Sequence, residues 1–255
     1  MSLEANISAT PPHTALYVSC LLNSLRPQLG HACAQLVTAV GHRLSVPRDQ
    51  TCCGQPGYNG GHRQQARAVA RSQLQLLADF DFVVVPSASC AGMFINHYPL
   101  LLADDPHWHE AALDLAGRTR ELSQFLRQQQ WQPQRRTSDP RRLAHHTSCA
   151  SRRETRSHSD TRQLLLAAGY QVEEPANAEI CCGFGGSFAA KFDRLSQRLG
   201  HQKLDACAAL AAEAVVSADL GCLLHLESVA GGPRQLPVYH VAELLAPVSG
   251  GRRTP

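Results

Sequence analysis

The chain has 255 residues, enough for one large domain or for two of about 120 residues each. Its hydrophobic share of 44% and charged share of 18% are typical of a globular protein and exclude disordered, collagen-like and coiled-coil chains. The net charge of +3 is too small to indicate nucleic-acid binding, and the lack of about 18 consecutive apolar residues predicts that no segment crosses a membrane.

The first half of the chain alternates strands with helices. Three apolar, β-branched runs predict buried parallel strands at 15–18, 43–46 and 82–85. Residues 62–79 repeat apolar side chains at helical spacing, and a further helix is predicted at about 109–130. This order predicts βαβ units with right-handed crossovers.

The same order returns after residues 132–141, a polar segment with two prolines that predicts a linker. Strands are predicted at 143–146, 171–173, 214–217 and, at an edge, 237–240, with helices at 161–168, 195–212 and 241–245. We therefore predict an α/β protein of two tandem domains related by pseudo-twofold symmetry, each a small parallel sheet flanked by helices. The predicted domains are 14–131 and 142–246, with disordered tails at 1–13 and 247–255.

Ten cysteines stand against two methionines and two tryptophans. Residues 1–14 carry no apolar core of a signal peptide, so a cytoplasmic location is expected. In a cytoplasmic chain of this size, many cysteines indicate metal or redox chemistry rather than a disulfide scaffold.

Eight of the cysteines obey one spacing rule twice. In the first half, 31 residues separate Cys20 from the pair Cys52-Cys53, and 36 separate that pair from Cys90. In the second half, the corresponding separations are 31 and 39 residues, and the cysteines are Cys149, Cys181, Cys182 and Cys222. Simple packing would not require the same spacing twice, which indicates two copies of one functional unit.

The cysteines of each set follow predicted strands. Because the carboxyl ends of parallel strands share one edge, where ligands normally bind, we expect four thiols to meet in each half at the carboxyl ends of its strands. Cys33 and Cys207 lie outside the repeat, within helical patterns, and are predicted to be buried packing residues.

Thiolates that gather in one place repel each other, so each set indicates a positively charged centre. Adjacent cysteines chelate a single zinc ion awkwardly, but they can bind different irons of a cluster, which favours iron–sulfur over zinc. Gly54 and Gly183, directly after the cysteine pairs, allow a tight turn that can direct N–H groups at sulfur. A structural zinc site and reversible thiol–disulfide chemistry at the vicinal pairs stay open as alternatives.

These segments resemble the cysteine-rich CCG domain family, which includes the cysteine-rich subunit of heterodisulfide reductase and iron–sulfur subunits of lactate and glycolate oxidation systems. The segments that carry the resemblance are 51–56, 86–90, 146–149, 181–188 and 219–225. Within the family, the likeness is greatest to the lactate-utilisation subunits.

The resemblance implies an iron–sulfur subunit that helps to oxidise L-lactate to pyruvate together with two partner subunits, one of them carrying ferredoxin-type clusters. It implies one or two clusters held by the eight cysteines of the repeat. The chain itself has no dinucleotide-binding Gly-x-Gly-x-x-Gly and no ferredoxin-type cysteine run, so its electrons must come from or go to partners, and we do not expect it to act alone as an enzyme.

The chain departs from the heterodisulfide reductase pattern at the third element, where Cys-x-x-Cys supplies a fifth cysteine for a non-cubane cluster. Here Ser87 and Asp219 stand in place of the first cysteine of that pair. Four thiolates per half suit an ordinary [4Fe–4S] cluster, and Ser87 and Asp219 are candidate oxygen ligands. Ala150 stands where related chains often carry a histidine.

Two histidines lie close to cysteines in the sequence, but no catalytic residue can be assigned. His146, three residues before Cys149, can donate a hydrogen bond to a cluster or handle a proton, or it is a core residue. His225 is predicted to be a core residue. An arginine-rich segment around the linker is predicted to be solvated, or to dock an acidic partner or a carboxylate substrate; nucleic-acid binding is not expected.

Overall fold

The structure is a computed structural model that describes residues 10–135, 141–176, 178–231 and 235–247. Most of the two predicted tails, and residues 136–140 of the predicted linker, lie outside the described residues. No helix within the described ranges is long and apolar enough to cross a membrane.

The first half forms a sheet of four parallel strands in the order β2-β1-β3-β4. The strands are β1 (His13–Leu16), β2 (Arg43–Ser45), β3 (Phe82–Val85) and β4 (Thr119–Glu121). The helices are α1 (Cys20–Leu25), α2 (Pro27–Thr38), α3 (Gln55–Asn59), α4 (Arg63–Leu76), α5 (Ala88–Gly92), the π-helical η1 (Met93–His97), α6 (Tyr98–Leu101), α7 (Pro106–Arg118) and α8 (Leu122–Gln128). The connection after β1 leads to one side of the sheet and the connection after β2 crosses to the other, so the topological switch point lies between β1 and β3.

The second half repeats this architecture, with parallel strands in the order β6-β5-β7-β8. The strands are β5 (Arg142–His145), β6 (Gln171–Glu173), β7 (Ala214–Ser217) and β8 (Val238–His240). The helices are α9 (Cys149–Arg153), α10 (His158–Ala167), α11 (Ser187–Lys191), α12 (Asp193–Ala208), α13 (Leu220–Val229) and α14 (Val241–Leu245). The predicted α/β class with two pseudo-twofold-related parallel sheets is confirmed, and each of the seven predicted strands is found within two residues of its predicted ends.

The prediction of one helix at 109–130 is wrong, because β4 divides this segment into α7 and α8. Thr119 turns the backbone into an extended conformation, and Glu121 then begins α8 by accepting a hydrogen bond from the N–H of Ser123 at 2.8 Å. Gln124 completes a capping box by accepting from the N–H of Glu121. The polar triplet Thr-Arg-Glu shows no strand pattern. Only its equivalence to β8 in the repeat indicates a strand.

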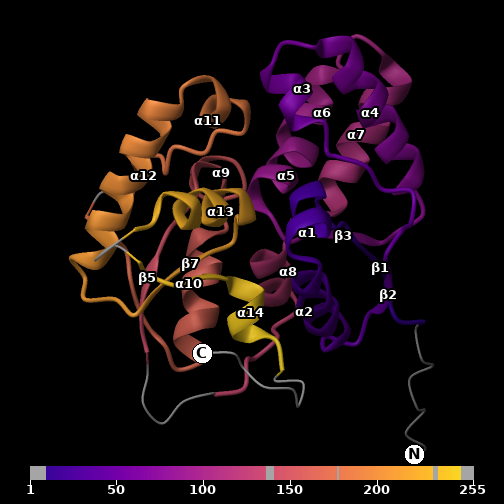
Figure 1. Cartoon of the computed structure of the whole chain (residues 1–255). Helices are drawn as coiled ribbons and strands as arrows, with labels where there is room; N and C mark the ends of the chain where they lie inside the picture. Colours follow the sequence, from indigo (N-terminus) through magenta and orange to yellow (C-terminus); the bar gives the residue numbers. More distant parts are fainter. Residues whose placement is uncertain (1–9, 136–140, 177, 232–234, 248–255) are drawn as a thin grey trace, which may run out of the picture.

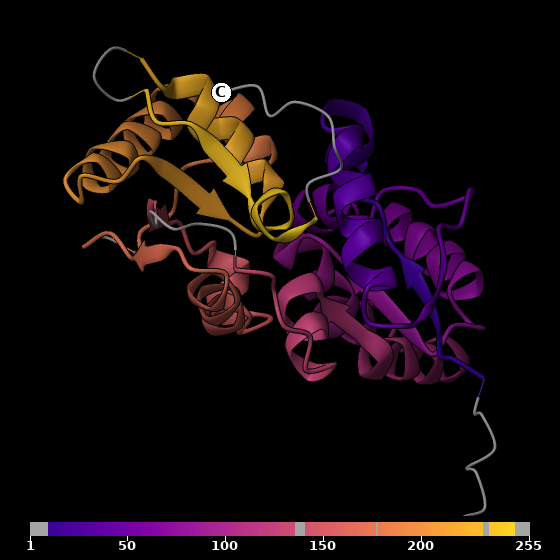
Figure 2. The same cartoon turned by 90° about the horizontal axis from the view of Figure 1, so that it is seen from below.

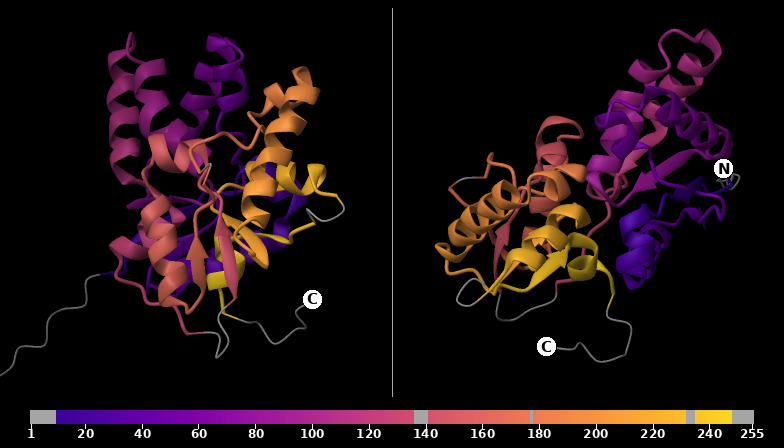
Figure 3. Two further views of the ribbon diagram at one scale, coloured as in Figure 1. Left: turned by 90° about the vertical axis from the view of Figure 1, so that its left-hand side faces the viewer. Right: turned by 45° about the horizontal axis from the view of Figure 1, so that its top comes forward.

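The two halves lie side by side (Figures 1, 2 and 3). They share a central hydrophobic core. Helix α2 of the first half contacts α14 of the second, and α8 contacts α10. Buried residues from both halves belong to this core, among them Leu29, Phe125, Leu164 and Leu245. Each half has a further core on the other face of its sheet, so the central core joins two α/β units into one body.

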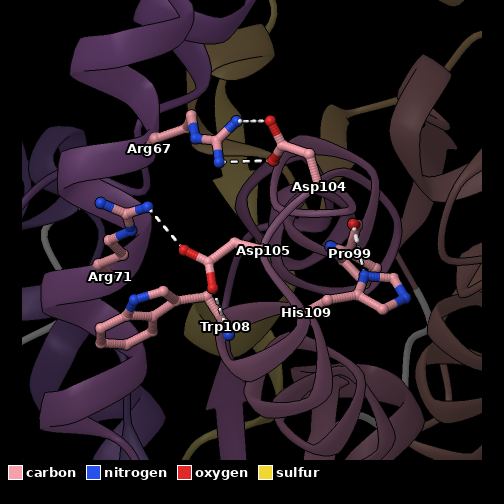
Figure 4. Close-up of polar contacts among 7 residues, drawn as sticks. All are labelled: Arg67, Arg71, Pro99, Asp104, Asp105, Trp108 and His109. Carbon is pink, nitrogen blue, oxygen red and sulfur yellow. Dashed lines mark hydrogen bonds and ion pairs between the residues drawn. The ribbon is translucent and has the colours of Figure 1, made fainter.

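Ion pairs fix the outer helical layer of the first half, as Figure 4 shows. Arg67 of α4 pairs with Asp104, and Arg71 pairs with Asp105 at 2.9 Å. The guanidinium of Arg71 also lies 5.7 Å from the centre of the Trp108 ring. These contacts hold the start of α7 against α4, on the side of the sheet away from the central core.

Candidate metal centre

The first set of cysteines lies at the carboxyl ends of three neighbouring strands. Cys20 begins α1 after β1, Cys52 and Cys53 follow β2, and Cys90 lies in α5 after β3. The thiol of Cys52 contacts those of Cys20 and Cys53. The sulfurs of Cys53 and Cys90 lie 3.5 Å apart. The structure therefore brings all four predicted thiols together.

The second set has the same arrangement around β5, β6 and β7. Cys149 begins α9, Cys181 and Cys182 precede α11, and Cys222 lies in α13. The thiol of Cys181 contacts those of Cys149 and Cys182, and Cys182 contacts Cys222. The two sets are thus brought together by equivalent elements of the two sheets.

Both sets line one cavity of about 390 Å³ between the two halves. Its walls include all eight cysteines of the repeat together with His146, Glu154, Phe184 and Asp219. Cys53 and Cys182 are buried, whereas Cys20 and Cys149 are exposed. Two thiol clusters therefore face a common space that is open on one side.

The glycine after each cysteine pair adopts a left-handed conformation, with φ of 83° at Gly54 and 98° at Gly183. The N–H of Gly183 donates to the sulfur of Cys181 at 3.3 Å, and the N–H of Gly54 donates likewise to Cys52. A Cβ at Gly183 would lie 2.4 Å from the carbonyl oxygen of Ser196. The turn that presents the second cysteine pair therefore requires glycine.

The thiols of each set do not all ionise together. The pKa of Cys52 is lowered because Cys20 and Cys53 donate hydrogen bonds to its sulfur, and the pKa of Cys181 is lowered in the same way. The pKa of Cys53 is raised by the adjacent Cys52 and by burial. One thiolate per set is thus stabilised by its neighbours, and a fully deprotonated set requires a positive centre.

The two candidate oxygen ligands, Ser87 and Asp219, lie at the interface between the two halves. The carboxylate of Asp219 accepts hydrogen bonds from Ser87 Oγ at 3.2 Å, from Ser89 Oγ at 2.9 Å and from Ser148 Oγ at 3.1 Å. It also accepts one from the backbone N–H of Ser89. Both carboxylate oxygens of Asp219 are engaged by these contacts. The hydrogen bond between Ser87 and Asp219 thus links the two halves near their cysteine sets. Metal ligation by either residue stays a prediction.

His146 is buried beside the second set. A ring nitrogen of His146 and the sulfurs of Cys182 and Cys222 all lie within 4.8 Å of one another. Burial lowers the pKa of His146 to about 3, so its neutral form is favoured. His225, in contrast, is engaged with Ser196 at 3.3 Å in the core, as predicted.

Cys33 and Cys207 are fully buried in hydrophobic cores, as predicted for packing residues. Sequence reasoning missed Lys203, which is buried in α12 and electrostatically coupled to Cys182. A signal was available, because Lys203 lies on the helix face that also carries the buried Gly200 and Cys207. A charged residue on an otherwise apolar face indicates a nearby partner.

The arginine-rich segment has structural roles in part. Arg152 pairs with Glu174 and donates to Thr147 Oγ1 at 2.6 Å. Nε of Arg142 lies 3.9 Å from Oε1 of Glu173. Arg142 thus links β5 to β6, and Arg152 links α9 to the residues that follow these two strands. Docking of an acidic partner by the remaining arginines stays a prediction.

The residues present fit an iron–sulfur cluster in each half. Each set offers four soft sulfur donors in contact with one another, backbone N–H groups aimed at sulfur, and an adjoining cavity. Thiolate ligation of this kind is the rule for such clusters. The same donors would also suit another thiophilic metal.

A family model described as "CCG: Cysteine-rich domain" matches residues 14–95 and 143–227, one match in each half. The chain is similar to proteins named "Lactate utilization protein A". It is 35% identical to that of Halalkalibacterium halodurans, over 91% of this chain and 95% of the relative. It is also 35% identical to that of Geobacillus thermodenitrificans, over 91% and 97%.

Among solved structures, the chain is similar to a hypothetical protein from Helicobacter pylori, with a TM-score of 0.64 and 11% sequence identity. The match covers 97% of this chain and 52% of that protein, so the chain spans about half of its length. At this identity the similarity concerns the fold alone.

Proposed function

The chain belongs to the CCG cysteine-rich domain family, and on this premise we propose that it is an iron–sulfur redox subunit of a multi-subunit system that oxidises L-lactate to pyruvate. Its similarity to proteins named Lactate utilization protein A supports a role in lactate utilisation. The finer part of the proposal is that one or two [4Fe–4S] clusters in this chain pass electrons between partner subunits and an acceptor.

The observation that carries the proposal is the convergence of eight cysteines on one cavity. When bound, an iron–sulfur cluster supplies one-electron transfer. The chain's own residues would hold the cluster from the carboxyl edge of each sheet, through Cys20, Cys52, Cys53 and Cys90 in the first half. In the second half the ligands would be Cys149, Cys181, Cys182 and Cys222.

Partner subunits follow from what the sequence lacks. Conversion of L-lactate to pyruvate removes two electrons and two protons, and the sequence contains no dinucleotide-binding Gly-x-Gly-x-x-Gly and no ferredoxin-type cysteine run. We therefore propose two partner subunits, one with ferredoxin-type clusters. The exposed Cys20 and Cys149 mark the side from which a partner would approach.

Two other chemistries have specific support. A single zinc ion is favoured by the grouping of His146, Cys182 and Cys222 within 4.8 Å. Thiol–disulfide exchange at the vicinal pairs is favoured by the contact of the Cys52 thiol with that of Cys53, and of the Cys181 thiol with that of Cys182.

Anaerobic purification and reconstitution, followed by iron, sulfide and EPR analysis, tests the proposal. We expect iron and acid-labile sulfide in equal amounts and an EPR signal on reduction, retained in a Cys207→Ser control that lies outside both sets. Stoichiometric zinc without iron would replace the proposal by the zinc alternative. A metal-free Cys52–Cys53 disulfide that cycles reversibly, seen by alkylation and mass spectrometry, would replace it by thiol–disulfide chemistry.

The substrate is tested separately by the genes next to this one. Adjacent genes for a protein with ferredoxin motifs and for a third small subunit are expected. If the purified subunits together reduce an acceptor with glycolate but not with L-lactate, the assignment of L-lactate is wrong while the redox role stands.

A further inference from the structure

The two cysteine sets differ at one equivalent position. Three residues before the first cysteine of each set stand Tyr17 in the first half and His146 in the second. Both follow the first strand of their sheet, and both are buried. The backbone N–H of each also donates to the next strand of the sheet, Tyr17 to Val84 and His146 to Val216, both at 2.9 Å. The same backbone position therefore carries a phenol beside one set and an imidazole beside the other.

The hydroxyl of Tyr17 has a hydrogen-bond partner within the protein. Its hydroxyl donates a hydrogen bond to the carbonyl oxygen of Thr51, the residue before the first cysteine pair. Its ring meets the edge of Phe94 in the core, with centroids 4.8 Å apart. Tyr17 thus supports the loop that carries Cys52 and Cys53, and its oxygen is directed at that loop.

The polar atoms of His146 have no such partner. Its side chain is only 2% exposed, and neither ring nitrogen has a hydrogen-bond partner among the described residues. A buried polar atom without a partner is costly for the folded state and requires an explanation, such as an ion. The ring nitrogen lies within 4.8 Å of two sulfurs of the second set, Cys182 and Cys222, and His146 also lines the cavity.

We infer that His146 is a nitrogen ligand of the metal centre in the second half, whereas the centre of the first half has sulfur ligands only. The inference rests on the proposed function, because it requires a metal centre at the second set. Imidazole is a common ligand of iron as well as of zinc. It is neutral, so an imidazole that binds an iron in place of one thiolate leaves the second centre with one negative charge fewer.

The two centres would then differ in a way that does not depend on turnover. Histidine ligation places a magnetically active nitrogen directly on one cluster, and a hydrogen bond from an uncoordinated ring does not. Nitrogen couplings measured by electron spin echo envelope modulation on the reduced protein separate these two cases. Growth with ¹⁵N-labelled histidine then identifies the nitrogen as that of an imidazole without any substitution.

The expected result is a strong nitrogen coupling in the reconstituted full chain that changes with ¹⁵N-histidine. In His146→Gln this coupling is lost and the EPR spectrum of one centre changes, while the other centre is unaffected. His146→Cys, which keeps a donor atom at the position, retains iron but loses the coupling. The matched control His225→Gln removes another buried imidazole of the same half, one engaged by Ser196, and keeps the coupling.

Two outcomes overturn the inference, and they are distinguishable. Clusters that show only weak nitrogen couplings, unchanged by ¹⁵N-histidine or in His146→Gln, refute histidine ligation and leave the proposed function intact. A protein that binds no iron after reconstitution refutes the proposed function and the inference together.

Discussion

The first half has a buried glutamine near its cysteines, whereas the second half has a buried lysine at the equivalent position. Gln73 of α4 and Lys203 of α12 occupy equivalent buried positions, seven residues after the buried Ala66 and Ser196. Gln73 donates to Thr51 Oγ1 at 3.1 Å, while Lys203 interacts electrostatically with Cys207 and then with Cys182, Cys149 and Cys181 of the second set. One backbone design thus provides two electrostatic environments, and the two sites are not interchangeable.

The largest effect is expected when one cysteine sulfur is removed from one set at a time. Cys53→Ser and Cys182→Ser are each expected to remove the centre of their own half, because each contacts two thiols of its set. Iron per chain should fall by half in each variant if both halves hold a cluster. Unchanged iron in one variant and complete loss in the other would show that only one half binds a cluster.

The glycines after the cysteine pairs should differ in their tolerance of a side chain. Alanine at either position is strained by the left-handed backbone, but at Gly183 its Cβ would also meet the backbone oxygen of Ser196 at 2.4 Å, against 3.3 Å to a Val69 methyl at Gly54. We expect Gly183→Ala to lower the free energy of unfolding by about 2–4 kcal/mol, and Gly54→Ala by about 1–2 kcal/mol. Urea unfolding of both variants measures the difference, and equal losses would contradict it.

Glu121 should make stability fall as pH rises. It is fully buried at the start of α8, and burial raises its pKa from 4.5 to about 8. The folded state therefore keeps a proton that the unfolded chain releases, so this stabilisation is complete below about pH 4.5 and is lost as pH rises through about 8. In Glu121→Gln, which keeps the capping oxygen, the free energy of unfolding should lose this slope between pH 4.5 and 8, which is worth about 5 kcal/mol. A slope that survives the substitution would assign it to another group.

The equivalent residue of the second half, His240, should act in the opposite direction. Burial lowers its pKa from 6.5 to about 4, so the unfolded chain binds a proton that the folded state does not. Its stabilising contribution is complete above about pH 6.5 and is lost as pH falls through about 4. His240→Asn, which can still cap α14, should flatten the acid side of the stability profile by about 3 kcal/mol. Acid unfolding identical to that of the parent protein would contradict this.

The smallest expected effect concerns the charge of Lys203. Lys203→Gln reproduces the first half's residue in the second half, and should lower the midpoint potential of the second centre by about 50 mV, because a nearby positive charge favours the reduced form. EPR-monitored redox titration measures the two centres separately. The reciprocal variant Gln73→Lys should raise the midpoint potential of the first centre only. A shift in the potentials of both centres in either variant would show that the charge does not act locally.

Much of the fold can be predicted from the sequence because its central strands are short apolar runs with a strong pattern. The strand at Phe82–Val85 is an example, and the repeated cysteines at strand ends locate both sets. The edge strand β4 is not predictable in this way, because an edge strand needs little apolar sequence and Thr119–Glu121 has almost none.

The site's supporting contacts depend on packing between segments far apart in the sequence. The sequence predicts Asp219 only as a candidate ligand, but its carboxylate is engaged by Ser87 and Ser89, about 130 residues away along the chain. The shared cavity likewise depends on how α2 and α8 pack against α14 and α10. Local sequence patterns carry no information about such pairings.

The central core has a consequence for how the two sites can change. If each half were a separate chain, the apolar surface around Leu29 and Phe125 would favour a symmetric pair of identical subunits, in which every substitution appears twice. Because both halves belong to one chain, they keep the same packing across the central core, and a residue can differ between the two copies. Tyr17 and His146 are such a difference: a specialisation of one site that a homodimer of identical halves could not acquire.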